Sequence, residues 1–228
     1  MRVGVIVGVL MFAATATGQP KPPPKVEPKR PAKPKDGGAY AGPKVESGVA
    51  VLLDEDVKPL IDAIYLKTSG RDPALTVDRD DVFAGLEAVK QTGQELHAAA
   101  LSGWDFQFVE RPKAANEYRY LRFAWKKQGG QAICIQLNHD GAWGPAGGNP
   151  AKFRYHAGPG PECYGASVPV DPKLPGNFVV VTRDLFADFG EFTLTGLALS
   201  PVDGEAARYD HIYLGKSLRD FELVAPKK

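Results

Sequence analysis

The sequence of 228 residues lacks the signatures of the common catalytic sites. It has no HExxH zinc motif, no paired CxxC, no CxxCH haem attachment site, no glycine-rich phosphate loop and no serine nucleophile elbow. These absences exclude the enzyme classes that such motifs identify, and we expect a non-catalytic protein. A glycan-processing hydrolase stays a third alternative, because the spacing of its paired carboxylates is set only in three dimensions.

A basic surplus is also lacking, since 28 Lys and Arg residues balance 27 Asp and Glu residues. Nucleic-acid-binding domains normally carry such a surplus, so we expect no nucleic acid partner. Cysteine is scarce, with only Cys134 and Cys163 present. In an exported chain these two can form one disulfide. The sequence leaves this open, because it does not give the distance between the two Cα atoms.

The longest apolar run stands at the N-terminus, where residues 3–14 follow the single positive charge of Arg2. This run is shorter than the about 20 residues that a membrane-spanning helix needs. The small residues at positions 14, 16 and 18 fit a signal peptidase site. We therefore expect residues 1–18 to be a signal peptide, and the mature protein to be secreted or periplasmic without a transmembrane segment. An uncleaved anchor is the alternative.

Proline and lysine dominate the next stretch, which begins PKPPPKVEPKRPAKPK. Proline fixes φ and removes a backbone donor, so this stretch cannot join a helix or the interior of a sheet. We expect residues 19–44 to be a disordered, extended linker, and residues 45–224 to form one folded domain. The basic side chains of the linker can hold the protein to anionic envelope polymers. The alternative is that the linker is only a solvated tether.

Apolar residues recur with a period of two from residue 117 onward. The inward set is Leu121, Phe123 and Trp125 before a glycine turn at 129–130, and Ile133, Ile135 and Leu137 after it. This alternation predicts strands with one face in the core, and the glycines predict a hairpin between them. Further strands are predicted at 177–183, 192–201 and 207–215, which together indicate an all-β sandwich.

In the last of these strands, period two predicts that Ile212 and Leu214 are buried. Tyr209, His211 and Tyr213 then lie on the opposite face. We interpret His211 as a hydrogen-bonded strand residue and not as a general base.

The first part of the domain contains a different spacing. Val57, Leu60, Ile61 and Ile64 recur with helical spacing, with Pro59 in the first turn, where its missing donor is harmless. A strand is predicted over 104–110. The fold class is therefore a β-sandwich with one or two short helices, and Trp104 and Trp125 are assigned to core packing.

Residues 80–215 resemble the galactose-binding-like jelly-roll superfamily, which includes carbohydrate-binding modules and discoidin-type domains. The resemblance is carried by TLTGLALSP followed by RYDHIYLG, which look like the two strands that close the sandwich in that superfamily. It implies a jelly roll, an early strand within residues 81–92 in place of a helix, and glycan binding on a sheet face or at loop tips.

The same resemblance implies a structural calcium ion, because many relatives use an acid of the closing strand as a ligand. Asp210 stands at the matching position. The neighbouring acids Asp78, Asp80 and Asp81 would supply further oxygens, since calcium takes six to eight of them. The cluster lacks the glycine and glutamate of an EF-hand loop, and a solvated acidic turn is the alternative. We expect no other cofactor.

A binding surface is predicted on the polar side of the strands. Its residues are Tyr120, Arg122, Gln136, Asn138, Arg154 and His156, with Trp143 at the rim in the glycine-rich loop 138–150. Aromatic faces stack on the apolar side of a sugar ring, and polar groups fix its orientation. The sequence thus predicts an exported, non-catalytic module for carbohydrate or another envelope polymer. The alternatives are an ordinary solvated face and a structural domain with a protein partner.

Overall fold

The computed structural model describes residues 40–46, 48–67, 74–92, 98, 100–143, 153–159, 167–203 and 206–224. The predicted signal peptide, 1–18, and the predicted linker up to residue 39 lie outside these residues. At Tyr40 the chain already packs against the core, and its hydroxyl accepts a hydrogen bond of 2.9 Å from Nε1 of Trp104. Within the described part, no helix has the length and apolarity to cross a membrane.

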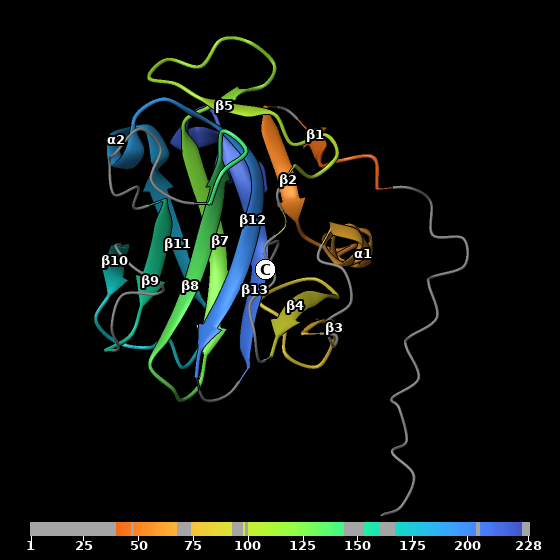
Figure 1. Cartoon of the computed structure of the whole chain (residues 1–228), viewed down its shortest axis with the longest axis vertical. Coiled ribbons are helices and arrows are strands. Elements are labelled where there is room, and N and C mark those ends of the chain that lie inside the picture. The colour runs from red at the N-terminus through yellow and green to blue at the C-terminus, as the bar shows by residue number, and fades with distance from the viewer. Residues whose placement is uncertain are drawn as a thin grey trace, which may run out of the picture. The chain divides into compact units, whose positions relative to one another are not determined.

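Two β-sheets face each other across one core (Figure 1). Sheet A has seven strands: β1 (Lys44–Glu46), β2 (Val49–Leu53), β3 (Leu75–Asp78), β4 (Ala88–Gln91), β7 (Tyr120–Lys127), β11 (Val179–Asp184) and β13 (Ala207–Gly215). Sheet B has six: β5 (Phe106–Phe108), β6 (Glu117–Tyr118), β8 (Ala132–His139), β9 (Arg154–Ala157), β10 (Val168–Asp171) and β12 (Phe192–Val202). The short helices are α1 (Lys58–Lys67), α2 (Leu185–Phe189) and the 3-10 helix η1 (Leu218–Glu222). The predicted fold class is confirmed.

The core confirms the period-two pattern of the central strands. Leu121, Phe123 and Trp125 of β7 are buried, as are Ile133, Ile135 and Leu137 of β8. Trp104 is 4% exposed and stacks edge-on with Phe106, so its assignment to packing is also correct. Successive side chains of a strand point to opposite faces. One apolar set per strand, pointing inward, is therefore enough to form the core between two facing sheets.

The connection between β7 and β8 differs from the predicted hairpin. Gly129 and Gly130 do take positive φ values, 69° and 86°. However, β7 pairs with β11 and β13 in sheet A, whereas β8 pairs with β9 and β12 in sheet B. The turn therefore carries the chain from one sheet to the other. The hairpin prediction is wrong because alternation tells which face of a strand is buried, but not which sheet the strand joins.

The first part of the domain follows its predictions more closely. Helix α1 starts at Lys58, with Pro59 in its first turn, and buries Leu60, Ile61 and Ile64. A strand, β5, lies within the predicted range 104–110. In the segment 81–92 only Ala88–Gln91 form a strand, β4, and the preceding residues form an irregular loop.

Strand β13 has two different neighbours along one of its edges. β4 pairs with its first part, Ala207–Tyr209, and β2 pairs with its second part, Ile212–Gly215. β2 and β4 thus follow one another along the same edge, and positions 210–211 fall between them (Figure 1). On the opposite edge, β7 pairs with both parts of β13, Ala207–Asp210 and Tyr213–Gly215.

A β-bulge occupies that gap. Against β7, Asp210 lies opposite Ala124 and Tyr213 opposite Arg122, so β13 has one residue more than its partner. The backbone of His211 takes a φ of 50°, a value that residues other than glycine rarely adopt. Because the extra residue shifts the alternation, Tyr209 is buried in the core together with Ile212 and Leu214. The predicted outward position of Tyr209 is therefore wrong.

Candidate functional site

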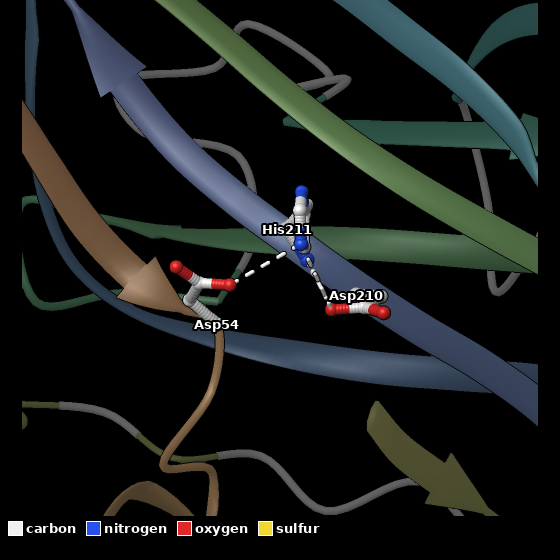
Figure 2. A group of neighbouring side chains, drawn as sticks. All are labelled: Asp54, Asp210 and His211. Carbon is white, nitrogen blue, oxygen red and sulfur yellow. Dashed lines mark hydrogen bonds and ion pairs between the residues drawn. The ribbon is translucent and has the colours of Figure 1, made fainter. Parts of the chain in front are cut away.

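Three ligand-bearing side chains meet at the bulge (Figure 2). Asp54 directly follows the last residue of β2, and Asp210 and His211 are neighbours on β13. Nε2 of His211 lies 3.2 Å from Oδ1 of Asp54 and 4.0 Å from Oδ1 of Asp210. Among the described residues, this is the group of three or more Asp, Glu, His or Cys side chains whose ligand atoms all lie within 4.8 Å of one another. This group could hold a metal ion.

Asp210 closes the gap between β2 and β4. Its carboxylate is completely buried; Oδ2 accepts hydrogen bonds from the backbone N–H of Phe83 (2.9 Å) and Ala84 (3.4 Å). Oδ1 accepts from the N–H of His211, at 2.7 Å. Burial raises the pKa of Asp210 to about 7, and these three hydrogen bonds oppose the rise. The side chain therefore takes the place of a neighbouring strand at this point of the sheet.

Asp54 and His211 face each other at the edge of the solvent. The Asp54 side chain is 32% exposed, and the Tyr213 hydroxyl donates a hydrogen bond to its carboxylate. Burial raises the pKa of Asp54. Burial also lowers the pKa of His211, which favours a neutral imidazole with a free lone pair. The rings of Phe83 and Tyr213 meet the His211 ring edge-on, at centroid distances of 5.2 and 5.4 Å.

The predicted calcium ligands other than Asp210 lie apart from it, and two of them, Asp78 and Asp81, are in ion pairs. Oδ2 of Asp78 is 2.9 Å from Nε of Arg208, and its Oδ1 accepts from the N–H of Asp80 and of Asp81. The Asp81 carboxylate pairs with Nζ of Lys126 at 2.8 Å and with Arg208 at 2.9 Å. Two cations thus already pair with Asp78 and Asp81, Asp80 is exposed, and the structure does not bring the three acids into one ligand set with Asp210. This arrangement does not fit a calcium site.

The predicted sugar-binding residues do not share one face. Tyr120 and Arg122 lie on β7 in sheet A, whereas the other four strand residues lie on β8 and β9 in sheet B: Gln136, Asn138, Arg154 and His156. They were expected on one face because β7 and β8 were expected to pair.

The sheet B side of this set is also less accessible than predicted. Gln136 and Asn138 are at most 1% exposed; Gln136 donates to Oγ of Ser200 at 3.0 Å, and Asn138 accepts from the Thr195 hydroxyl. His156 is also buried, with its Nδ1 2.8 Å from Oγ of Ser167. The prediction of a solvated polar face is therefore wrong for these three residues.

Two further predicted residues are only partly covered by the structure. Trp143 follows β8 and is half-buried, while residues 144–150 of its loop lie outside the described residues. Cys134 is fully buried on β8 and is disulfide-bonded. The only other cysteine in the sequence, Cys163, also lies outside the described residues.

A row of polar side chains crosses the outer face of sheet A beside the bulge. Strand register places Arg122 between the exposed Thr182 on β11 and Tyr213 on β13. Asp54, directly after β2, and His211, on β13, lie next to Tyr213 at the bulge. We call the four residues Thr182, Arg122, His211 and Asp54 the sheet A strip.

Aromatic rings lie on two sides of the sheet A strip. On one side, Arg122 donates to the carbonyl of Phe221 in η1 at 3.2 Å, and its guanidinium lies 5.9 Å from that ring centroid. On the other side, half-buried Phe83 and Phe178 are in contact, with a centroid distance of 5.9 Å, and Phe83 also touches His211. The strip therefore combines a carboxylate, a guanidinium, an imidazole and a hydroxyl with neighbouring rings.

Asp54 is the residue of this site that sequence reasoning missed. Its available signal was an acid placed directly after the apolar run VAVLL, where a strand ends at the edge of the sheet. His211 was expected to be a hydrogen-bonded strand residue. In the structure its Nε2 is buried and makes no hydrogen bond.

Comparison with known proteins adds little to this description. No protein family model matches the chain, and no curated protein matches it. One similar solved structure is the glycoside hydrolase domain of Endo-D from Streptococcus pneumoniae R6, with 13% sequence identity and a TM-score of 0.41. The match covers 66% of this chain and only 21% of that one. A likeness this distant carries no functional argument. The fold and the site themselves define a β-sandwich protein with a group of side chains able to hold a metal ion.

Proposed function

We propose that this domain is an exported, non-catalytic binding module for carbohydrate or another envelope polymer. The observation that carries the proposal is the sheet A strip, where Asp54, Arg122 and Thr182 bring an acceptor, a donor and a hydroxyl to one outer face. Sugar recognition needs such polar groups to orient the hydroxyls and aromatic rings to cover the apolar side of the sugar ring. The proposed export rests on the predicted signal peptide.

Exposure along the strip supports this assignment. The side chain of Asp54 is partly open to solvent, Arg122 is half-buried and Thr182 is exposed. Tyr213 and Phe221 hold Asp54 and Arg122 in place from the side. Groups that are held in position and partly exposed can exchange water for a ligand's hydroxyl groups at a small cost in side-chain entropy. The resemblance of residues 80–215 to the galactose-binding-like superfamily supports the same ligand class.

The rim residue predicted from the sequence, Trp143, offers a second location in the other sheet. It lies beyond the end of β8, in sheet B, and it is half-buried. A ligand bound there would depend on Trp143 and not on the strip. The two locations can be separated by variants in each sheet.

Blocking the strip is expected to abolish ligand retention. In Thr182→Trp an exposed hydroxyl gives way to a bulky ring beside Arg122, and we expect at least tenfold weaker binding to the polysaccharide that retains the wild type. The measurement is a glycan array followed by pull-down on the retained polysaccharides. The matched control is Gln107→Trp, at an exposed position of β5 in sheet B, which should bind as the wild type does.

Other outcomes would contradict the proposal or move the site. Retention of no glycan at all by the wild type would overturn the function. Loss of binding in Trp143→Ala, with Thr182→Trp unaffected, would place the ligand on sheet B. Capture of one stoichiometric envelope protein in place of glycan would favour the structural domain, and turnover that depends on one carboxylate would favour a hydrolase.

A further inference from the structure

We propose that Asp54, Asp210 and His211 form a binding site for a divalent transition-metal ion, such as Zn²⁺, and not for calcium. This inference rests on the bulge in β13 and does not depend on the proposed glycan function. It also departs from the calcium ion that the resemblance implies, because two of the acids proposed for calcium, Asp78 and Asp81, are paired with Arg208 and Lys126.

The donor atoms point to this class of ion. Two carboxylates and one imidazole supply oxygen and nitrogen, a combination that zinc and similar ions accept readily. Calcium instead takes six to eight oxygen ligands, and His211 cannot supply one. The separation of 3.2 Å between Nε2 of His211 and Oδ1 of Asp54 also fits, whereas the 4.0 Å between Nε2 and Oδ1 of Asp210 requires these two atoms to move closer on binding. Two ligand atoms that each lie 2.0–2.1 Å from a tetrahedral zinc ion are about 3.3 Å apart.

The second observation is an unsatisfied buried nitrogen. The His211 side chain is 10% exposed, and its Nε2 is buried without a hydrogen-bond partner. That atom lies 3.2 Å from Oδ1 of Asp54, which follows the last residue of β2 (Figure 2). Leaving a buried polar atom unpaired destabilises the folded state. A metal ion bound by Nε2 would remove this destabilisation.

The surrounding structure holds each ligand in place. Three backbone N–H groups fix the Asp210 carboxylate, and the Tyr213 hydroxyl fixes that of Asp54. The bulge holds His211 at a φ of 50°, an uncommon conformation of the kind that persists where surrounding contacts impose it. Such supporting contacts are what orients metal ligands in proteins. The exposed third of the Asp54 side chain leaves a route for the ion and room for water as a further ligand.

The test is a titration of the full, tag-free chain after removal of metals by a chelator. Zn²⁺, Mn²⁺, Mg²⁺ and Ca²⁺ are each added alone in calorimetry, and bound zinc is counted by elemental analysis. We expect one Zn²⁺ per chain, at least tenfold tighter binding of Zn²⁺ than of Ca²⁺, and a higher melting temperature with zinc.

Three variants locate the ion. His211→Asn removes the imidazole while keeping a side chain that tolerates positive φ, and Asp54→Asn removes one carboxylate at a partly exposed position. Both are expected to weaken Zn²⁺ binding at least tenfold. Asp81→Asn, in the acid cluster first considered for calcium, is the matched control and should bind Zn²⁺ as the wild type does.

Three results would overturn the inference. These are a wild type that binds no Zn²⁺, undiminished Zn²⁺ binding in Asp54→Asn, and Ca²⁺ binding that Asp81→Asn abolishes. Circular dichroism checks that each variant is folded; if His211→Asn is not, Asp54→Asn decides alone. Because the probe is the metal ion without glycan, a negative glycan array leaves this result unaffected.

Discussion

Replacement of Asp210 by alanine is expected to lower the free energy of unfolding by about 4 kcal/mol, because one buried and two partly buried backbone N–H groups would lose their acceptor. The donors belong to Phe83, Ala84 and His211, which lie where β13 has no neighbouring strand on that edge. Urea unfolding followed by the fluorescence of Trp104 and Trp125 measures the change. A chelator in all samples removes any contribution of a bound metal.

Two comparisons make this prediction specific. Asp210→Asn keeps one carbonyl oxygen as an acceptor, so we expect about half of the loss seen with alanine. Asp56→Ala removes an exposed acid near the same site and should change stability by less than about 0.5 kcal/mol. If Asp210→Ala unfolds at the same urea concentration as Asp56→Ala, the side chain does not close the sheet as described.

Tyr209→Phe is expected to cost about 3 kcal/mol, although it removes only one oxygen atom. The Tyr209 hydroxyl accepts a hydrogen bond from the N–H of Ser200 at 3.0 Å and donates one to the carbonyl of Cys134 at 2.7 Å. These two residues are partners in the pairing of β12 with β8, whereas Tyr209 comes from sheet A. The hydroxyl thus links the two sheets through buried polar groups.

Tyr118→Phe provides a closely matched control. Tyr118 and Tyr209 are both fully buried, but the Tyr118 hydroxyl has no hydrogen-bond partner. Removing it should leave stability unchanged or raise it slightly, because an unpaired buried hydroxyl gives way to an apolar edge. Equal losses for the two variants in urea unfolding would show that Tyr209 contributes through its ring alone.

Much of the sandwich could be predicted from the sequence, because strand periodicity is a local property. Leu121 and Ile133 each have apolar neighbours two positions away, and this spacing indicates which face of their strands is buried. Sheet membership is not local: it depends on which edge a strand meets, and nothing around Gly129 specifies that β8 joins the other sheet. Because β7 and β8 belong to different sheets, Arg122 and Gln136 lie apart, and the predicted single binding face does not form.

The bulge limited the prediction of the site in the same way. Strict alternation placed Tyr209 and His211 on one face, and one additional residue in β13 sent them to opposite sides. Asp210 was identified through the resemblance to a known superfamily. Asp54 and His211 could not be joined to it from the sequence, because 156 positions separate Asp54 from Asp210 and only the pairing of β2 with β13 brings them together.

The arrangement of β2 and β4 along one edge of β13 has a mechanical consequence. A pull applied at Tyr40 would load β1 first, a three-residue strand with an exposed Val45, and then β2. β2 is joined to β13 only along the part that follows the bulge, so it can peel away while β4 and β7 stay attached. Because Asp54 hangs from the end of β2, tension on the N-terminal side would draw it away from His211 before the rest of the sandwich gave way.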